Sequence, residues 1–472
     1  MNVTLMAMKV GRVISADELD AKALAQRIVE DARVEAARIL AEAQRDGARA
    51  TAAQLATAEG RVHEVTGLVV RATVPGVSLG EIVRLDHPNG PVAAEVVGFR
   101  GEEAVLLPLG ELGGLAPASA VWRTGGPLAI RCGDDLLGRV LDGTGAAIDG
   151  GPELTGESWA VDRASAAALD RPPIRAPQPT GVRAIDAMLT LGRGQRIGLF
   201  AAAGVGKSTL LGQIARGAQA DVIVLCLVGE RGRELNELLG DELAPARGRC
   251  VTVCATSDAP PLVRVRAAFV ATAIAEWFRE RRGANVLFVC DSLTRVARAQ
   301  REVGLSAGEP VARHGYPPSV FALLPRLVER TGATAQGAIT AIYTVLVAGN
   351  DHDEPIADEA RGLLDGHVVL DRRLAQRGHF PPIDVVASVS RLMPRVVDAR
   401  HVEAAAHVRA RLAIYEEHRE LVALGAYQTG RDRQVDAAVA AYPAIERVLR
   451  QPRDEIADWD AAIDALHELR KR

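Results

Sequence analysis

One stretch of this sequence has residue types and spacing that suit the binding of a polyphosphate. Residues 196–211 read RIGLFAAAGVGKSTLL, which is a short apolar run, a turn of small residues and an amphipathic segment. This order predicts a strand, a phosphate loop and a helix. Backbone N–H groups of such a loop can surround a polyphosphate, and the helix N-terminus adds its partial positive charge. The alternative is a glycine-rich turn that binds nothing, since the first position of the G-x-x-x-x-G-K-[ST] pattern is Ala201.

The pattern assigns roles within this loop if it holds a nucleotide. Lys207 would reach the β- and γ-phosphates, and Ser208 would ligate Mg²⁺. The cradle around the phosphates would consist of Ala203, Gly204, Val205, Gly206, Lys207, Ser208 and Thr209.

Two acidic residues follow other apolar runs of the chain. Asp291 follows NVLFVC, and Glu230 ends a run that begins at Val222. Phosphoryl transfer needs a charge cradle, a metal, a residue that orients the attacking water and a cation. We expect Asp291 to hold Mg²⁺ through water and Glu230 to polarise the water. One acid at a strand end is commonly a cap or a surface charge, but two of them in the sheet of a phosphate loop favour function.

Strands and helices alternate between about residues 180 and 395, which predicts a parallel sheet wound with crossover helices. Four strand candidates, at 222–228, 286–290, 339–347 and 385–389, are β-rich apolar runs, and the last ends in Ser390-Arg391. In open α/β sheets ligands bind outside the carboxyl ends of the strands. We therefore expect the residues at these strand ends to converge on the phosphate loop.

The 472 residues are 48% hydrophobic, which is enough for about three domains with large cores. From Gly60, short alternating runs separated by Pro-Gly, Pro-Asn-Gly and Arg-Gly turns predict a small β-barrel or sandwich that ends near Trp122. Residues 128–152 are Gly-rich and lead to a Pro-rich segment at 172–179, which predicts a linker-like approach to the next domain. After about Val396 the pattern predicts a long helix, a break at Thr429-Gly430 and two shorter helices.

Residues 11–58 form a separate arm with a long helical pattern. Ser15 and Glu18 have capping-box spacing, so we expect a helix from about Ala16. Its apolar positions form a thin heptad stripe of Ala25, Val29, Ala32, Ala36, Ile39 and Ala43. A partner-binding helix and a solvated charged arm remain equal alternatives. The expected domains are thus the arm at 1–59, the barrel at 60–127, the core at 128–395 and a helical domain at 396–472.

The overall composition excludes several classes of protein. A net charge of −4 and a pI near 6.2 give no general electrostatic case for a nucleic-acid binder. Of the five cysteines, only Cys250 and Cys254 have a metal-ligand spacing, and they lie in a β-like run, VTVCAT. We therefore expect buried free thiols in a reducing compartment rather than zinc ligands or disulfides. No secretory segment lies near Met1, and no apolar run reaches about 18 residues, so we expect a cytosolic protein that is at most peripheral to a membrane.

Several stretches together carry a family resemblance from about Gly60 to the C-terminus. They read LGRGQRIGLFAAAGVGKSTLL, VGERGREL, ATSDAPPLVRVRAA, VLFVCDSLTRVARAQREV, GEPVARHGYPPSVF and PPIDVVASVSR. In this order they resemble the catalytic subunits of the rotary-ATPase superfamily and, within it, the type III protein secretion ATPases. The resemblance implies an α/β fold with a RecA-like parallel-sheet P-loop core, an N-terminal β-barrel and a helical C-terminal domain. It also implies a homohexamer with ATP bound between subunits.

The resemblance also implies roles for particular residues of the site. It implies that Lys207, Glu230 and the adjacent Arg231 are catalytic, and that Ser208 and Asp291 lie at the Mg²⁺ of Mg²⁺·ATP. Arg391 in SVSR resembles an arginine finger that reaches the γ-phosphate of a neighbouring subunit, and Phe380 in GHFPPID stands where an aromatic ring stacks on adenine. Arg295, one helical turn past Asp291, is a further candidate, and a simple ion pair with nearby acids is its equal alternative.

Two features distinguish branches of this superfamily. Residues 425–436 read GAYQTGRDRQVD in place of the acidic motif of a synthase β-type subunit, which resembles the secretion and flagellar branch. The loop AAAGVGKS lacks the Gly-Ser of the flagellar enzyme at positions 202 and 203, which favours the virulence-type injectisome. The arm instead resembles the start of the secretion stator protein, so a natural fusion, a misjoined gene and an engineered fusion all stay open.

The function implied is an ATP-hydrolysing hexameric motor in the cytoplasm, at the inner-membrane base of a type III secretion apparatus. Such a motor releases chaperones from export substrates and unfolds them. Its expected partners are the stator protein, the central stalk protein, the sorting platform, the export gate and chaperone–effector complexes, with no nucleic acid and with peripheral membrane association.

Three alternatives remain. One is the flagellar export ATPase. Another is a non-catalytic nucleotide-binding ring subunit, against which Glu230 argues. The third is an RNA-translocating hexameric helicase, which predicts exposed aromatic side chains on the N-terminal domain, where only Phe99 and Trp122 are available.

Overall fold

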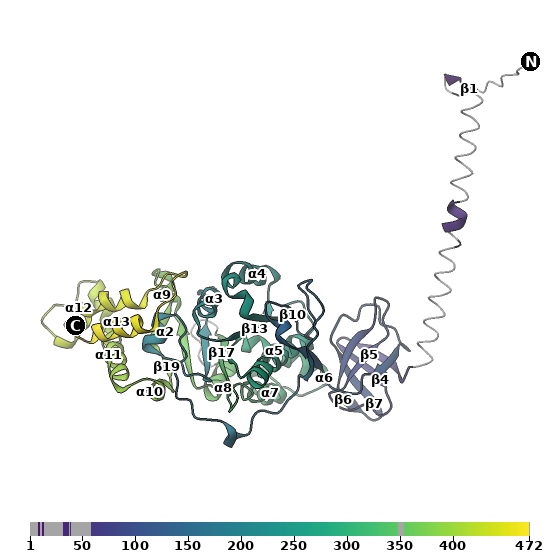
Figure 1. Ribbon diagram of the computed structural model, residues 1–472, viewed down its shortest axis with the longest axis horizontal. Helices are drawn as coiled ribbons and strands as arrows, with labels where there is room; N and C mark the ends of the chain where they lie inside the picture. Colours follow the sequence, from purple (N-terminus) through teal and green to yellow (C-terminus); the bar gives the residue numbers. More distant parts are fainter. Residues whose placement is uncertain are drawn as a thin grey trace, which may run out of the picture.

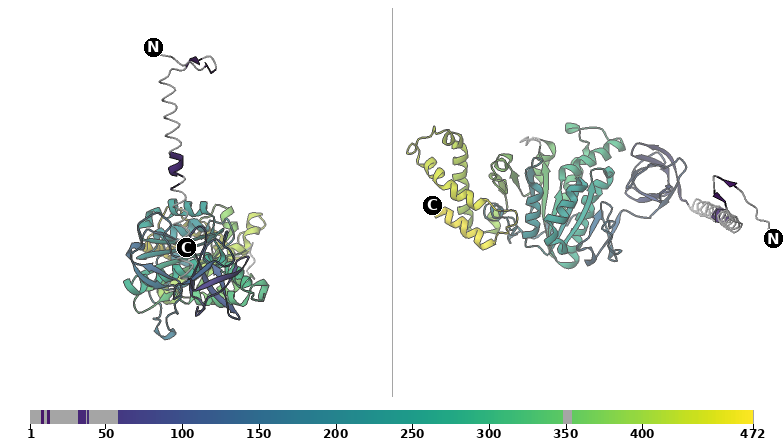
Figure 2. Two further views of the ribbon diagram at one scale, coloured as in Figure 1. Left: turned by 90° about the vertical axis from the view of Figure 1, so that its right-hand side faces the viewer. Right: turned by 90° about the horizontal axis from the view of Figure 1, so that it is seen from above.

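The structure is a computed structural model that describes residues 8–9, 12–13, 32–36, 38, 58–347 and 354–471. From residue 58 onward the chain forms a barrel at one end, an α/β core in the middle and a group of helices at the other end (Figure 1). The two turned views show the same order of the three parts (Figure 2). This arrangement confirms the fold class expected from the sequence.

Six antiparallel strands close the barrel in the order β3-β4-β7-β6-β5-β8. Every second side chain points inward, so that small and branched residues such as Val62, Val70 and Leu106 fill the interior. Gly67 has a φ of 60° in the tight turn between the first two strands, a conformation that glycine adopts without strain. The strands are β3 (Gly60–Thr66), β4 (Val69–Thr73), β5 (Ile82–Leu85), β6 (Val92–Arg100), β7 (Glu103–Pro108) and β8 (Ala120–Arg123).

The core is a nine-stranded sheet with the order β10-β14-β13-β15-β17-β12-β18-β19, and a short strand β16 pairs with β17. Neighbouring strands from β10 to β18 are parallel, whereas β18 with β19 and β16 with β17 are antiparallel. The strands are β10 (Val140–Asp142), β12 (Arg196–Ala201), β13 (Val222–Glu230), β14 (Cys250–Thr256), β15 (Asn285–Asp291), β16 (Gly332–Ala333), β17 (Ala338–Leu346), β18 (Gly366–Leu370) and β19 (Ile383–Ser390).

Helices bury both faces of this sheet, which is why its central strands read as continuous apolar runs. In β13, Val222, Val224 and Cys226 pack on the side of α5, and the alternate residues pack on the side of α3. The helices of the core are α2 (Arg183–Met188), α3 (Lys207–Gly217), α4 (Gly232–Glu237), α5 (Pro261–Arg282), α6 (Leu293–Ala307), α7 (Pro318–Val328), α8 (Pro355–Leu363), α9 (Arg372–Gln376) and α10 (Met393–Val396).

The linker-like interpretation of residues 128–152 was wrong. This segment contains β9 (Ala129–Cys132), which pairs with β11 (Glu157–Ala160), and β10, which forms the edge of the main sheet beside β14. The strands are only three or four residues long, and glycines such as Gly145, with a φ of 88°, make the turns between them. Such short strands leave no periodicity in the sequence.

The last strand corrects a second expectation. Because β19 is antiparallel to β18, its carboxyl end lies at the edge of the sheet where the parallel strands begin. Ser390 and Arg391 therefore lie at the opposite edge from the phosphate loop of the same chain. The backbone N–H of Arg391 donates to the carbonyl of Asp365, which is next to the start of β18. The expectation that all four strand ends converge within one chain was wrong for this strand.

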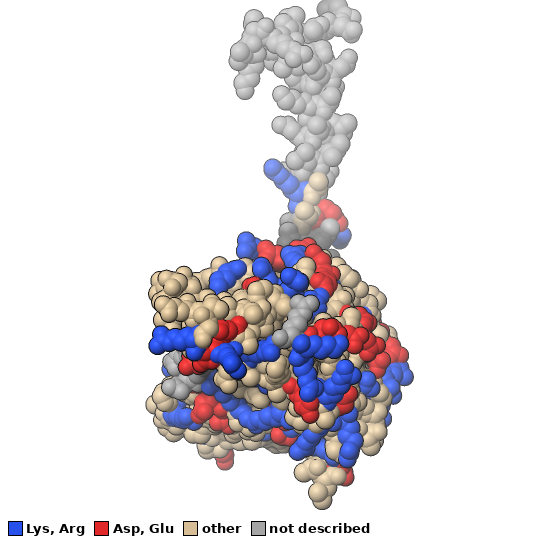
Figure 3. All heavy atoms as spheres, turned by 90° about the vertical axis from the view of Figure 1, so that its left-hand side faces the viewer, with Lys and Arg blue, Asp and Glu red and all other residues tan. Residues whose placement is uncertain are grey.

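The C-terminal part consists of α11 (Ala399–Ala423), α12 (Arg433–Leu449) and α13 (Trp459–Lys471), as predicted. Asp398 and Asp432 cap the first two of these helices by accepting hydrogen bonds from backbone N–H groups. Gly430, with a φ of 92°, lies in the break between α11 and α12. On the surface seen from the end of the molecule that carries these helices, positive and negative side chains are interspersed (Figure 3).

Little of the N-terminal arm is described. β1 (Met8–Lys9) pairs with β2 (Arg12–Val13), and residues 32–36 are helical and exposed. Ala32 and Ala36 of the predicted stripe belong to this helical turn. The capping pair Ser15 and Glu18 and the other stripe residues lie outside the described residues.

All five cysteines are buried and free, as predicted. In the described part of the chain, no helix is both long and apolar enough to cross a membrane.

Candidate nucleotide-binding and catalytic site

The predicted strand, loop and helix are all present around the phosphate loop. β12 ends at Ala201, α3 begins at Lys207, and the loop between them is buried on one side and open on the other. Gly204 and Gly206 have φ angles of 77° and 98°. A Cβ at Gly204 would meet nothing within 4 Å, so the loop encloses free space there and its backbone conformation, not crowding, requires glycine. No side chain caps α3, which leaves the N–H groups of its first turn available to an anion.

Lys207, Glu230 and Asp291 meet at the carboxyl edge of the sheet. Lys207 follows β12 across the phosphate loop, and Glu230 and Asp291 are the last residues of β13 and β15. Because these strands are parallel, their carboxyl ends lie at the same edge of the sheet. The Lys207 ammonium pairs with Asp291 Oδ1 and lies 3.4 Å from Glu230 Oε1. The side chains are only 12%, 13% and 2% exposed for Lys207, Glu230 and Asp291. Buried charges are stable only when paired, so each of the three depends on the others.

Two further side chains hold the acids in place. Thr344 Oγ1, on β17, donates to Asp291 Oδ1 over 2.7 Å, and Arg295 Nη1, on α6, lies 2.5 Å from Glu230 Oε1. The ion-pair interpretation of Arg295 is therefore confirmed. Sequence reasoning missed Thr344, although a polar residue in the middle of a buried apolar strand was a usable signal.

A bulge turns Glu230 toward this cluster. The register between β13 and β14 shifts between Val228 and Glu230, and Gly229 has a φ of 70°. A Cβ at Gly229 would lie 2.9 Å from Arg295 Cδ, so a larger residue here would displace the arginine side chain, and the positive φ also favours glycine. Bulges of this kind re-aim the side chain that follows them.

The surroundings of Glu230 keep it ionised. Burial opposes its charge, but the Arg295 guanidinium, a hydrogen bond with Glu234 and the charge of Lys207 outweigh burial and lower the pKa of Glu230. The same hydrogen bond with Glu230 raises the pKa of Glu234, one helical turn further on. Of these two carboxyl groups, Glu230 thus releases its proton first. Sequence reasoning had not singled out Glu234.

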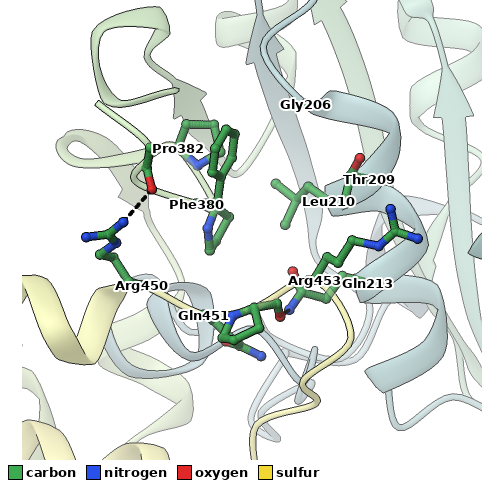
Figure 4. Close-up of a pocket in the computed structure, with 12 residues that line it drawn as sticks. Gly206, Thr209, Leu210, Gln213, Phe380, Pro382, Arg450, Gln451 and Arg453 are labelled. Atoms are coloured by element: carbon green, nitrogen blue, oxygen red, sulfur yellow. Dashed lines mark hydrogen bonds between the residues drawn. The ribbon is translucent and has the colours of Figure 1, made fainter. Parts of the chain in front are cut away.

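A cavity of about 560 Å³ opens beside the phosphate loop. In Figure 4 the ring of Phe380 faces Thr209, Leu210 and Gln213 of α3 across this cavity. The ring is 48% exposed, and a Cβ at Gly206 would lie 3.9 Å from it. A half-exposed aromatic ring at the rim of a mostly apolar cavity can stack on a flat base. The structure thus brings Phe380 next to the loop, as the resemblance implied.

The other wall of the cavity comes from the segment between α12 and α13, residues 450–453, which the sequence gave no reason to suspect. The Gln451 N–H donates to the carbonyl of Phe380 over 2.8 Å, and Gln213 Nε2 donates to the carbonyl of Pro452 over 3.1 Å. Arg450 Nη2 donates to the carbonyl of Gly378 over 2.6 Å, the dashed line in Figure 4. These bonds fix the helical domain to both sides of the cavity.

The donor set beside the loop fits Mg²⁺. The Ser208 hydroxyl and the Asp291 carboxylate are hard oxygen donors, and Mg²⁺ is commonly held by one or two such side chains together with phosphate oxygens and water. In the part of the chain that the structure describes, no group of three or more His, Cys, Asp or Glu side chains is placed to hold a metal ion. Mg²⁺ here would therefore also need oxygen atoms of phosphate and water.

Two of the expected residues do not join the cluster. Arg231 is exposed at the start of α4, directly after Glu230. Arg391 is exposed at the far edge of the sheet, where its Nη2 lies 3.3 Å from the carbonyl of Arg361.

Comparison with known proteins agrees with this site. The ATP synthase alpha/beta family models match residues 62–125 as the β-barrel domain and 181–390 as the nucleotide-binding domain, and the T3SS EscN ATPase C-terminal domain matches 397–468. The fold and the phosphate loop thus define an ATPase of the ATP synthase alpha/beta family.

Individual relatives narrow the class further. The chain is 49% identical to the type 3 secretion system ATPase of Xanthomonas euvesicatoria, covering 86% of this chain and 93% of the relative. It is 47% identical to the flagellum-specific ATP synthase of Bacillus subtilis, covering 87% and 94%. The assembled ATPase EscN of the enteropathogenic E. coli type III secretion system superposes with a TM-score of 0.82 at 43% identity, covering 87% of this chain and all of that one. The chain therefore belongs to the type III secretion and flagellum-specific branch of this ATPase family.

The ion pair between Arg295 and Glu230 leads to a pH prediction. In Arg295→Met the guanidinium is lost while Glu230 stays buried, so the pKa of Glu230 rises. If the ionised carboxylate is required for turnover, the acid limb of the kcat/KM profile moves to higher pH. The variant should then lose more activity near about pH 6 than near about pH 8.5. Arg298→Met, an exposed position on the same helix, is the control and should keep the parent profile. An unshifted acid limb in Arg295→Met would contradict this role of the ion pair.

Proposed function

We propose that this protein is the ATP-hydrolysing motor of a type III protein secretion system and works as a homohexameric ring. The observation that carries the proposal is the meeting of Lys207, Glu230 and Asp291 beside an open phosphate loop. The nearby cavity, bordered by Phe380, has the size and lining for a nucleoside.

ATP would lie with its base against Phe380 and its phosphates along the cradle of residues 203–209. Lys207 would leave its ion pairs with the two acids to contact the β- and γ-phosphates, while Ser208 and Asp291 would hold Mg²⁺. When bound, Mg²⁺ supplies positive charge to the phosphate oxygens.

Glu230 is the proposed base for hydrolysis. A carboxylate with a lowered pKa is ionised at neutral pH and can accept a hydrogen bond from the attacking water. Arg295 holds that carboxylate in position, and Arg231 adds positive charge at the mouth of the site. Glu230 also argues against a non-catalytic ring subunit, because the structure holds this acid beside the lysine of the loop.

Binding and turnover should separate in two variants. Lys207→Ala removes a direct phosphate contact and should weaken ATP binding by about tenfold or more. Glu230→Gln removes only the activation of water, so it should bind ATP almost as the parent does and lose nearly all turnover. Fluorescent-nucleotide titration and steady-state phosphate release measure the two effects. Retention of most of the parent rate by Glu230→Gln at saturating ATP would show that another group is the base.

In a ring, Arg391 would act on the nucleotide of a neighbouring copy. Within its own chain this arginine is at the wrong edge of the sheet to contact the phosphates. In a head-to-tail ring that edge can face the phosphate loop of the next copy, where a guanidinium neutralises charge developing on the γ-phosphoryl oxygens. A related ATPase, EscN, has been solved in an assembled form and with its central stalk EscO, which supports a ring and a stalk partner here.

Mixed rings test this role. An arginine supplied by a neighbour contributes about 10³–10⁵ in rate, so Arg391→Ala should bind ATP and be almost inactive at every protein concentration. In rings that mix Arg391→Ala with Glu230→Gln, some interfaces combine an intact Glu230 with an intact Arg391. Partial ATPase activity should therefore return, although each variant alone is inactive. Rings shown to be mixed that stay inactive would rule out Arg391 as an arginine finger that acts on a neighbouring subunit.

The proposed role in the cell is the release of chaperones from export substrates and their unfolding, at the cytoplasmic face of the inner membrane. The proposed partners are a stator protein, a central stalk protein, the sorting platform, the export gate and chaperone–effector complexes. The flagellar export ATPase remains the second candidate, because relatives of both kinds match at almost the same identity. The division into 1–59, 60–127, 128–395 and 396–472 is our proposal for the domains.

The arm at 1–59 is proposed to attach the ATPase to the sorting platform, since its sequence resembles the start of the stator protein. A chain lacking residues 1–58 should keep its ATP turnover, because the site lies wholly within later residues. It should also fail to recover the platform protein in a pull-down. Equal recovery with and without the arm would rule out this attachment.

A further inference from the structure

We propose that the turn at residues 164–171 inserts Leu169 into a second copy of this chain and forms part of the contact between neighbouring subunits. The inference rests on the proposed ring and names a surface that would stabilise it.

Leu169 is fully exposed, at 100%, and no other large hydrophobic residue in the described part of the chain reaches that value. Three alanines precede it, so the tip of the turn is the apolar run Ala166–Leu169. A single exposed leucine is ordinary on a protein surface. This one differs because it lies on a turn that projects below the core, away from every other element (Figure 1). The turned view shows the same projection (Figure 2, left).

The base of the turn is fixed at both ends. The carbonyl of Val161 accepts from the guanidinium of Arg330 over 2.8 Å, and Arg330 itself is buried in an ion pair with Glu276. At the other end Arg171 donates to the carbonyls of Glu329 and Thr331 over 2.5 and 3.3 Å. Arg171 also donates to the carbonyl of Ala166 over 3.3 Å, which closes the turn on itself. A turn held in this way presents its apolar tip outward with little conformational freedom left to lose on binding.

The same contacts place the turn on the edge of the sheet that carries Arg391. Glu329, which pairs with Arg171, also pairs with Arg196 Nη1 over 2.7 Å. The Arg196 N–H donates to Asp365 Oδ2 over 3.0 Å, and the carbonyl of Asp365 accepts from the N–H of Arg391 over 3.0 Å. One network of bonds thus runs from the base of the turn to the proposed arginine finger.

The bonds between the base of the turn and Arg391 indicate which partner contacts Leu169. If the edge with Arg391 faces the phosphate loop of the next copy, a rigid projection from that edge points at the same neighbour. A head-to-tail contact joins two different surfaces of one chain, and it forms a ring when the rotation between copies closes. A second copy is therefore favoured over an export partner, which would have to share the edge with the neighbouring subunit.

Site-directed cross-linking tests the contact directly. The five native cysteines are buried, so the exposed thiol of Leu169→Cys can be labelled selectively with a benzophenone maleimide in the full chain. Illumination with a non-hydrolysable ATP analogue should give covalently joined chains, with the cross-link in residues 200–242 of the second chain. Leu424→Cys, 81% exposed in the parent at the end of α11, is the matched control and should give few joined chains. Cross-links from position 169 only within one chain would overturn the proposal.

Assembly gives an independent readout. Leu169→Asp should raise the protein concentration for half-maximal ATPase activity about tenfold, as expected when one apolar side chain leaves an interface, with the full rate regained at high concentration. Leu424→Asp should leave this concentration unchanged. Arg391→Ala, in contrast, stays inactive at all concentrations. If Leu169→Asp assembles like the parent while mixed rings regain activity, the proposed Leu169 contact is wrong and the proposed ring is kept. If mixed rings stay inactive, the proposed role of Arg391 between subunits is wrong, and the cross-linking result then shows whether Leu169 contacts a second copy.

Discussion

The pairing of one buried ammonium with two carboxylates is the interaction on which this structure depends. Asp291 is 2% exposed, and its carboxylate is paired with Lys207 and accepts a hydrogen bond from Thr344. Asp291 ends β15, Thr344 lies within β17, and Lys207 follows β12, so the interaction needs β17 between β15 and β12 with all three strands parallel. The site thus depends on the order and the direction of these strands.

The nucleotide cavity depends on a second part of the chain in the same way. Residues 450–453 form one of its walls and also join α12 to α13, while Gln451 is only 2% exposed and bonds to Phe380 on the core. The Gln451 amide also donates to the carbonyls of Gly181 and Glu455. The core alone would thus offer the phosphate loop without this wall of the cavity. These bonds join the helical domain to the core beside the cavity, while its far end extends away from the core (Figure 1).

Sequence reasoning found the phosphate loop and both acids because their signals are local: a residue pattern for the loop and a polar residue at the end of an apolar run for each acid. The expectation that the end of β19 lies beside the phosphate loop of the same chain was wrong, because strand direction is a property of the whole sheet, and nothing in residues 383–390 distinguishes a parallel strand from an antiparallel one. Sequence reasoning also failed for β10, where three residues are too few to show a period, and for residues 450–453, which contribute through backbone groups. The bulge at Gly229 likewise has only a single glycine as its signal.

The two edges of the sheet carry opposite chemistry, and this asymmetry is a physical argument for assembly. At the carboxyl edge, Lys207 and Arg295 both lie within ion-pair distance of Glu230, so the positive charge near this acid already has a partner. A cation from a neighbouring copy would add to Lys207 in neutralising the charge that develops on a γ-phosphoryl group. The chain carries an exposed arginine, Arg391, at its amino edge, bonded through the backbone into the network that also anchors the Leu169 turn. A single chain cannot bring its own Arg391 to its own phosphate loop. In a closed head-to-tail ring, the edge with Arg391 of each copy can face the phosphate loop of the next copy.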